Sequence, residues 1–242
     1  MKGLDLTFKP FGESAVLIEW PARINEDILS DIMALQEVIE KKLSASIIES
    51  VIAYNSLTLI FDREKTDPEH LQVEVNKLRS ITQKPDTSKN KLWKIPVCYN
   101  EELGIDLQEI SKAKKLSIDE IVAKHCEPTY TVYFIGFLPG FLYLGGLLPE
   151  LHQPRKSTPR IRIKKGAVAI GGNQTGIYPI ESPGGWNVLG NTPLSFFNPH
   201  SFPPCFASPG DRLQFYPIQL DHYHHLMEEV EIGRFKLESE SI

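Results

Sequence analysis

The sequence predicts an α+β protein, in which an N-terminal ferredoxin-like α/β domain precedes a β-barrel. Three observations lead to this prediction. Residues 14–99 alternate strand patterns with two amphipathic helix patterns. Residues 83–91 (QKPDTSKNK) carry turn formers and charges but no large apolar side chain, which is typical of a linker. Residues from 129 onward form short extended runs separated by turn residues. We therefore expect domains at residues 1–86 and 87–242.

Two helices and several strands make up the expected N-terminal domain. Apolar residues three and four positions apart predict a helix over 25–43, with Asn25 as its cap. Asp67 and Pro68 mark the start of a second helix, because Pro is tolerated at the first helical position. Strands are expected at 14–20, within 46–62 (two strands) and at 92–99. The resulting order βαββαβ is that of a split βαβ unit, with both helices on one face of an antiparallel sheet.

The C-terminal part begins with two short helices over residues 106–125. Ser117 and Glu120 form a capping-box pattern at the start of the second helix, which is expected to end at His125. Strands are expected at 130–137, 160–163, 167–172, 177–180, 186–190, 194–198 and 212–218. Strands at this spacing build a barrel or a sandwich. We favour the barrel, because the long loops need a rigid wall to hold them. The charged tail, residues 221–242, is expected to be partly helical and then to fray.

Composition excludes several classes of protein. The 242 residues include 41% hydrophobic ones, enough for a packed core. A net charge of −5 disfavours a general nucleic-acid binder. Residues 134–149 are apolar, but they contain two prolines and four glycines, so they predict turns rather than a membrane span. The start lacks a signal-peptide pattern and the three cysteines are widely spaced. We therefore expect a cytoplasmic protein with free thiols and no membrane or nucleic-acid partner.

Aromatic residues, glycines, prolines and arginines concentrate in residues 130–198, which indicates the wall of a concave site. Arg155 and Arg160 each follow a proline, which gives a rigid frame from which a guanidinium can bind a carboxylate or phosphate through two hydrogen bonds. Arg162 and Lys164 belong to the same basic run, but they fit a solvated strand face equally well. Arg155 and Arg160 are therefore the candidate anion-binding residues.

The motif ESPGGW (181–186) is the second candidate feature. Gly184 and Gly185 let the backbone approach a ligand closely, and Trp186 offers a flat wall with one donor. Glu181 stands beside Ser182, and a carboxylate next to a hydroxyl could position water or accept a proton. The alternative is a tight turn followed by a core tryptophan.

Other motifs carry weaker signals. His125 could act in acid–base catalysis or stabilise a helix C-terminus. Cys126 is not expected to be a nucleophile, because nothing in the sequence lowers its pKa. The tail histidines lack metal-ligand spacing, so no metal is predicted. The chain lacks GxxxxGK[ST] and GxSxG, and its glycine-rich GGNQTG (171–176) is a weak nucleotide loop.

Several motifs in order resemble one known family. They are Tyr130-x-Val132, GFLPGF (136–141), YLGGL (143–147), Pro154-Arg155, Pro159-Arg160 and YPxxSPGGW (178–186). Together they resemble the B-subunit family of bacterial 5-oxoprolinase. That family is also called allophanate hydrolase subunit 1, and it includes the Kip-type inhibitor of a sporulation histidine kinase. The chain departs from the family pattern at residues 164–166 (KKG, commonly Pro-Ala-Gly) and at Leu142, where Pro is usual. The glycines of the motifs are retained.

The resemblance implies a fold, a reaction and partners. The barrel would be cyclophilin-like, and the reaction would be the ATP-dependent opening of 5-oxo-L-proline to L-glutamate, performed together with the C and A subunits of 5-oxoprolinase. ATP with Mg would be bound by a partner or shared with it. Arg155 and Arg160 would hold the substrate carboxylate or the transferred phosphate, while Glu181 and His125 would be further catalytic residues. The expected substrate-binding residues are Tyr143, Gln174, Ser182, Gly184, Gly185 and Trp186.

Two other functions stay open at this point. The first is a protein-binding inhibitor of a sensor histidine kinase, which needs an exposed protein-binding patch but no anion site. The second is an amidase acting on allophanate, which ranks last because the chain has no nucleophile motif. The concentration of arginines and glycines favours the enzyme role.

Overall fold

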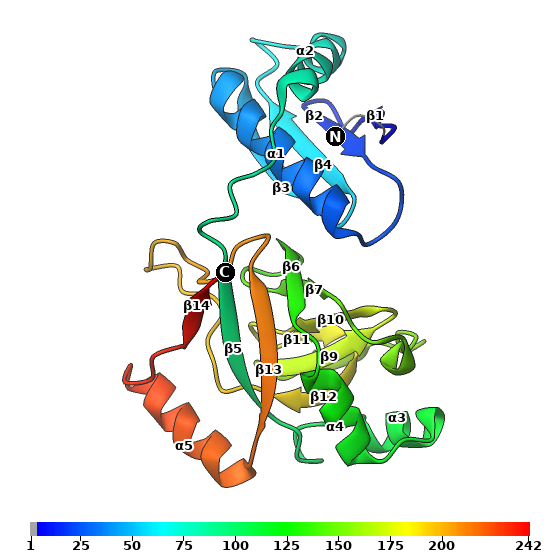
Figure 1. Ribbon diagram of the computed structural model, residues 1–242, viewed down its shortest axis with the longest axis vertical. Coiled ribbons are helices and arrows are strands. Elements are labelled where there is room, and N and C mark those ends of the chain that lie inside the picture. Colours follow the sequence, from blue (N-terminus) through cyan, green and yellow to red (C-terminus); the bar gives the residue numbers. More distant parts are fainter. Residues whose placement is uncertain (1–3) are drawn as a thin grey trace. The chain divides into compact units, whose positions relative to one another are not determined.

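The computed structural model describes residues 4–242, which form two compact units (Figure 1). The first unit reaches to Thr87 and the second spans Ser88–Ile242. Within the described residues, no helix combines the length and apolar character needed to cross a bilayer. Each unit has its own sheet and its own buried side chains, and they are described separately below.

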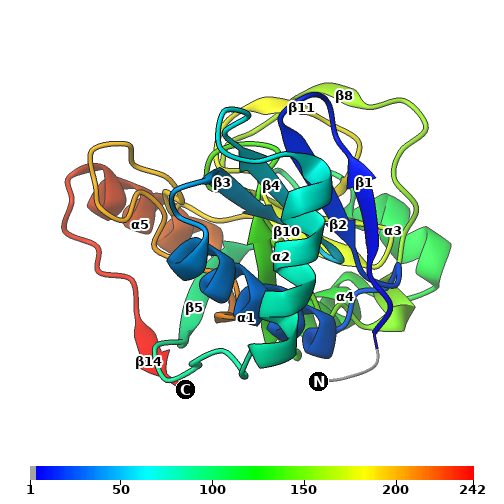
Figure 2. The same cartoon turned by 90° about the horizontal axis from the view of Figure 1, so that it is seen from above.

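Unit 1 is a four-stranded antiparallel sheet with two helices. The sheet order is β1-β2-β4-β3, so that β4 lies between β2 and β3. Helix α1 packs on β3 and β4 and contacts α2 (Figure 2). The bounds are β1 Thr7–Pro10, β2 Ala15–Glu19, α1 Glu26–Lys42, β3 Ile47–Ile52, β4 Ser56–Phe61 and α2 Pro68–Ile81.

Side-chain caps explain where these helices begin. The Asn25 side chain accepts hydrogen bonds from the backbone N–H groups of Asp27 and Ile28, at 2.9 and 3.2 Å. Asp67 accepts one from the N–H of His70 at 2.8 Å, and Pro68 occupies the first turn of α2. The helices predicted at both places are therefore confirmed, together with their caps.

The predicted fourth strand of this sheet is wrong, and the ferredoxin-like assignment is not confirmed. Residues 91–98 form a strand, but it belongs to unit 2, where it pairs with residues 212–218. The edge position beside β2 is taken by β1. Strand β1 is short and mostly exposed, so it carries no alternating apolar signal. The pattern of 91–98 predicted a strand correctly, but periodicity does not identify the strand's partner.

Unit 2 is a closed barrel of seven strands. The strand order is β12-β9-β10-β7-β6-β13-β5, and β5 closes the barrel by pairing with β12 at Asn191 and Cys98. A small two-stranded sheet of β8 and β11 stands beside it. The strands are β5 Lys91–Cys98, β6 Tyr130–Ile135, β7 Leu142–Gly145, β8 Arg160–Ile163, β9 Ala167–Gly171, β10 Gln174–Ile177, β11 Ser182–Gly184, β12 Asn187–Asn191, β13 Arg212–Ile218 and β14 Ser239–Ser241.

Closure decides between the barrel and the sandwich. Strands β5 and β13 run parallel and side by side (Figure 1), although more than a hundred residues separate them. The interior is filled by fully buried side chains such as Ile95, Val132, Leu144 and Phe215. Closing the sheet removes its exposed edges. The predicted barrel is therefore confirmed.

Helices surround the barrel. They are α3 Leu107–Lys114, α4 Ile118–Cys126, the short 3-10 turn Pro149–Leu151 and α5 Leu220–Glu231. The predicted capping box opens α4: the Ser117 hydroxyl accepts from the N–H of Glu120, and the Glu120 carboxylate accepts from the N–H of Ser117. Helix α4 ends at Cys126, one residue beyond the expected His125.

Three local predictions are corrected by the structure. Residues 177–180 are not a strand beyond Ile177, because the strand there occupies Gln174–Ile177. Residues 194–198 are irregular, although Leu194 and Phe196 are buried. The tail does not end as an unpaired segment, since β14 pairs with the start of β5. In the first two cases apolar residues serve the core without strand geometry, which the apolar pattern does not reveal.

Candidate active site

A cavity of about 500 Å³ opens beside the barrel, where three loops meet. Five aromatic residues contribute to its wall, and the lining also includes an arginine, a lysine and a serine. Its lining residues are Phe137, Leu138, Phe141, Tyr143, Arg155, Lys156, Pro159, Tyr178, Ser182, Pro183, Gly184, Gly185 and Trp186. Two other cavities, of about 460 and 680 Å³, lie elsewhere on unit 2. The first of the three is the one lined by residues of the segments in which the sequence placed its candidate site, and it joins aromatic rings with an arginine.

Trp186 is fixed by close packing on the barrel. A Cβ added to Gly171 would come within 2.8–2.9 Å of the indole, so only glycine leaves room for the ring there. Phe141 and Tyr143 meet the indole edge-on, with ring centroids 5.6 and 6.0 Å away. Edge-to-face contacts of this kind favour one orientation of each ring. The aromatic wall of the cavity is therefore preorganised.

Gly184 is required for a second close approach. A Cβ at this position would lie 2.3 Å from the Tyr178 hydroxyl oxygen and 2.7 Å from Ile163 Cδ1. Burial raises the pKa of Tyr178 to about 12, further above neutral pH than that of an ordinary tyrosine. The next residue, Gly185, accepts a hydrogen bond from the Lys156 N–H at 2.7 Å. This bond ties the loop of residues 182–186 to the loop that carries Arg155.

Arg155 presents its charge at the cavity. One Nη donates to the Gln174 side-chain oxygen at 3.2 Å, and the guanidinium lies 5.5 Å from the centroid of the Trp186 ring. Across residues 4–242, no carboxylate forms an ion pair with it. The side chain is exposed, so several of its five N–H donors can bind a ligand. Arg155 is therefore a cation that Gln174 and Trp186 hold in place and whose charge is not neutralised within the described chain.

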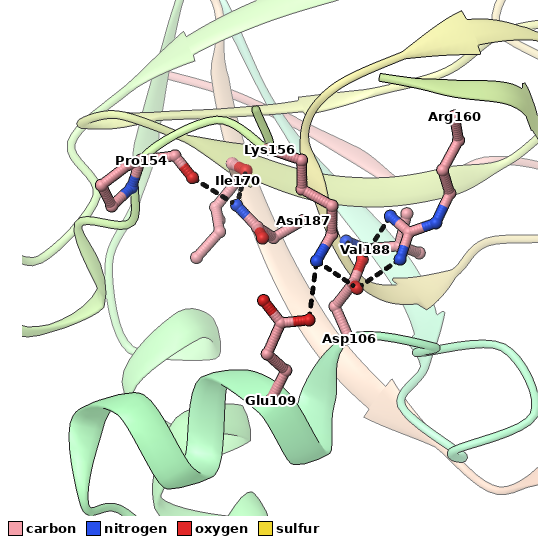
Figure 3. A network of polar contacts seen from close by, with 8 residues as sticks. All are labelled: Asp106, Glu109, Pro154, Lys156, Arg160, Ile170, Asn187 and Val188. Carbon is pink, nitrogen blue, oxygen red and sulfur yellow. Dashed lines mark hydrogen bonds and ion pairs between the residues drawn. The ribbon is translucent and has the colours of Figure 1, made fainter. Parts of the chain in front are cut away.

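Asp106 organises the polar contacts beside the cavity (Figure 3). It directly precedes α3, but its side chain makes no cap to that helix. Its two carboxylate oxygens accept hydrogen bonds from both Nη atoms of Arg160, at 2.6 and 2.9 Å. The Val188 N–H donates to the same carboxylate at 2.7 Å, and Lys156 Nζ lies 3.0 Å away. Glu109 binds Lys156 from the other side, at 2.8 Å.

This network determines which cations near the cavity stay available to bind a ligand. The Asp106 side chain is 1% exposed. Desolvation by burial opposes its ionisation, but hydrogen bonds from Arg160, Val188 and Lys156 outweigh that effect and hold its pKa below the ordinary value. Asp106 is therefore an anion that neutralises much of the charge of Arg160 and Lys156. Nearby, the Asn187 side chain donates to the Pro154 carbonyl at 2.9 Å, which fixes the backbone just before Arg155.

Comparison with known proteins places the chain in a family. The sequence model of the carboxyltransferase domain, subdomains C and D, matches residues 6–207. The B subunit of 5-oxoprolinase from Bacillus subtilis (strain 168) is 36% identical over 230 residues, which are 90% of this chain and 95% of that protein. The chain belongs to the B-subunit family of 5-oxoprolinase.

Other members support the same assignment. The B subunit of 5-oxoprolinase from Haemophilus influenzae is 36% identical over 206 residues, covering 85% of this chain and 95% of that protein. The crystal structure of TTHA0988 superposes with a TM-score of 0.75 at 34% identity, covering 85% of this chain. This chain spans 40% of the length of TTHA0988. The barrel fits the cyclophilin-like fold that the resemblance implied.

In this B-subunit family member, the cavity brings together most of the residues predicted from the sequence. Arg155 and five of the six expected substrate-binding residues line it: Tyr143, Ser182, Gly184, Gly185 and Trp186. The sixth, Gln174, contacts Arg155. Their roles toward a substrate stay predictions, and their convergence on one cavity is a structural fact.

Three expected catalytic residues do not line this cavity. Arg160 uses both Nη atoms on Asp106, so it supports the site from outside the cavity wall. Glu181 is exposed and lies 3.6 Å from Arg162 Nε. His125 is fully enclosed in unit 2. The short-range pattern selected Arg160 for its preceding proline and Glu181 for its neighbour Ser182, but their partners lie on other segments.

His125 is part of a buried hydrogen-bond chain. The Thr175 hydroxyl donates to the Ala169 carbonyl at 3.1 Å, so it accepts from His125 Nε2 at 3.0 Å. The other ring nitrogen, Nδ1, then accepts from the Tyr99 hydroxyl at 2.7 Å. The ring also stacks on Phe215, with centroids 4.7 Å apart. Both nitrogens are therefore occupied, and this geometry gives His125 a structural role in the core that differs from the helix-end role considered from the sequence.

The buried imidazole predicts a loss of stability in acid. Desolvation lowers the pKa of His125 to about 3, whereas an unfolded histidine titrates near 6.5. Between these values the unfolded state binds the extra proton, so stability falls as pH falls, by about 1.4 kcal/mol per unit. Urea unfolding followed by tryptophan fluorescence should show about 2 kcal/mol lost between pH 6.5 and pH 5. His125→Gln should flatten this slope, and the exposed control His222→Gln should keep it. An unchanged slope in His125→Gln would contradict the assignment.

Several site residues were not among the candidates chosen from the sequence. Phe137 and Phe141 stood in a recognised motif, but no role was assigned to either. Tyr178 and Lys156 line the cavity as well. Asp106 carried no visible signal, since an aspartate before a helix usually reads as a cap. Only contacts between distant segments reveal its function.

Proposed function

We propose that this protein is part of an ATP-dependent 5-oxoprolinase, which hydrolyses 5-oxo-L-proline to L-glutamate with the C and A subunits as partners. Membership of the B-subunit family supports the proposal, because the bacterial relatives named above are subunits of that enzyme. The role of this chain is to bind the substrate and hold it in position. We place the bound lactam in the cavity lined by Arg155 and Trp186.

The observation that carries this placement is an unneutralised cation at the edge of an aromatic cavity. The substrate is a small, flat lactam ring that bears one carboxylate. Arg155 offers a fork of donors that matches a carboxylate. The rings of Trp186, Phe141 and Tyr143 offer apolar surface for the lactam ring. The polar and apolar parts of the site therefore match the two parts of this substrate.

The cavity fits the lactam better than it fits ATP. A triphosphate needs several cations or N–H donors around its phosphates. Lys156, the other cation of the lining, is bound to Asp106 and Glu109. Arg155 alone does not supply a triphosphate site, so we assign ATP and its Mg to a partner polypeptide. When bound there, ATP would supply the phosphoryl group that turns the lactam carbonyl oxygen into a leaving group.

A partner polypeptide is part of the proposal. The relatives' names describe one component of an assembly, and the matching model is part of a carboxyltransferase domain. In TTHA0988 the similar segment belongs to a longer chain, which agrees with a second polypeptide beside this one. Inhibition of a sensor histidine kinase is not supported by these relatives. Allophanate hydrolysis has no support from an activated nucleophile, because within residues 4–242 the cavity lining holds the Ser182 hydroxyl but no histidine or carboxylate to act as its base.

The test is reconstitution. The chain is co-expressed with the C and A subunits of 5-oxoprolinase encoded in the same genome, and the complex is assayed for phosphate release with and without 5-oxo-L-proline. We expect lactam-stimulated phosphate release and glutamate formation in equal amounts. Allophanate and the isolated chain serve as controls, and neither should give the stimulation. An assembled complex that releases no phosphate with the lactam would refute the proposed function.

A further inference from the structure

Phe137 adopts a backbone conformation that an aromatic residue rarely takes. Its φ is +65°, and among the described residues the other non-glycine with positive φ is Lys115, at the end of α3. In this region the Cβ of an L-residue crowds the neighbouring carbonyl, so glycine or asparagine is normally found there. A strained residue of this kind is a reason to look for function.

The surrounding turn keeps Phe137 in this conformation. Leu138 N–H donates to the Gly136 carbonyl at 2.7 Å, and Phe141 N–H donates to the Leu138 carbonyl at 2.9 Å. Gly140, with φ of +83°, packs so closely that a Cβ would lie 2.8 Å from Phe197 Cβ. The turn is therefore anchored on both sides of Phe137, and its backbone directs the ring.

The ring itself contributes little to the fold. Phe137 is 62% exposed, although it is one of the residues that line the cavity. Its ring contact is an edge-on one with Phe141, at 5.6 Å between centroids. Phe141 in turn is buried against Tyr178 and Trp186, which form the cavity wall. Phe137 thus adds an exposed apolar face directly next to the preorganised aromatic wall.

The cavity is larger than the proposed substrate, so an additional side chain could contact the bound ligand. A volume of about 500 Å³ is in the range that holds a drug-sized molecule. A five-membered lactam is much smaller, so it would leave part of the cavity open. An apolar side chain over the ligand would remove apolar surface of both from water and so tighten its binding.

We propose that the Phe137 ring covers the bound lactam and determines how tightly it binds. This inference rests on the proposed function and adds a specificity residue to it. The Phe137 ring would contact the substrate equally in the ground state and the transition state, because it would touch the CH₂ groups of the lactam rather than its reacting carbonyl. Its removal should therefore raise KM and leave kcat nearly unchanged.

The decisive variant is Phe137→Asn, because asparagine tolerates positive φ while it removes the ring. We expect the Tm of the isolated chain to stay equal or to rise, whereas KM of the reconstituted complex for 5-oxo-L-proline rises about tenfold. Phe137→Tyr keeps the ring and should keep KM within about twofold. Ile161→Asn removes an exposed apolar side chain outside the cavity lining and should change neither value.

The outcomes separate this inference from the proposed function. A wild-type complex without lactam-dependent activity refutes the function. An active wild-type complex whose KM is unchanged in Phe137→Asn refutes the role of Phe137 alone. A variant that no longer co-elutes with its partner subunits, or that melts well below the wild type, would show a docking or structural role instead and would also overturn the inference.

Discussion

Replacing Arg155 with alanine is expected to lower kcat/KM of the reconstituted complex for 5-oxo-L-proline about a hundredfold, or roughly 3 kcal/mol of binding to the transition state. Arg155 is the cation of the cavity that no carboxylate in residues 4–242 neutralises, and Gln174 and Trp186 hold it in place. A ligand carboxylate would lose a charge-assisted, two-point contact. Initial rates of phosphate release over a range of lactam concentrations measure the effect.

A matched set of variants isolates the role of this guanidinium. Arg155→Lys keeps the charge but not the fork of donors, so it should recover only part of the loss. Arg162→Ala removes an exposed arginine outside the cavity lining, which lies near Glu181, and should leave kcat/KM within about twofold. If Arg155→Ala retains wild-type kcat/KM in a complex that assembles normally, the substrate does not bind where we place it.

The second large effect is expected on stability. Asp106→Ala should reduce the free energy of unfolding of unit 2 by about 3 kcal/mol or more, because it removes the buried partner of two cations. Arg160 would lose both of its hydrogen bonds to the carboxylate, and the Val188 N–H would lose its acceptor. Asp106→Asn keeps an acceptor but not the charge, so it should cost less. Urea unfolding of the isolated chain at neutral pH measures both.

A control variant separates the loss of the Asp106 ion pairs from the effect of removing any carboxylate. Glu102→Ala removes an exposed carboxylate four positions away and should leave the free energy of unfolding nearly unchanged. The lowered pKa of Asp106 adds a signature in pH. Its contribution is complete above the unfolded pKa, near 3.9, and is lost as pH falls through the folded pKa. If Asp106→Ala unfolds at the same urea concentration as Glu102→Ala, the ion pairs of Asp106 contribute nothing measurable.

Local features of the sequence predicted local features of the structure. The caps at Asn25, Asp67 and Ser117 marked the starts of three helices, because each side chain bonds to backbone only two or three residues away. Arg155 and Trp186 were recognised in the same way, from a preceding proline and a preceding pair of glycines. Interactions of this kind depend on neighbours in the chain, so they can be read directly from it.

Predictions that depended on distant partners were less successful. The strand at 91–98 was identified, but its pairing with 212–218 was not, and this error placed it in the wrong sheet. Arg160 was predicted to bind the carboxylate or phosphate of a ligand, but both of its Nη atoms bind Asp106, 54 positions away. For His125 the sequence left catalysis and stabilisation of a helix end open, whereas the ring is enclosed in unit 2 and bonds to Tyr99 and Thr175.

The sequence by itself determined the helices, most of the strands and the family, and it located the loops that hold the site. It favoured the barrel over a sandwich, and closure of the sheet at β5 and β12 decided between them. The tertiary structure decided which charges of the basic run face a ligand. It paired Arg160 and Lys156 with Asp106, and among residues 4–242 it left Arg155 without a carboxylate partner. The physical reason is that the availability of a charge depends on which oppositely charged group folding brings within a few ångströms of it, and sequence distance does not report that separation.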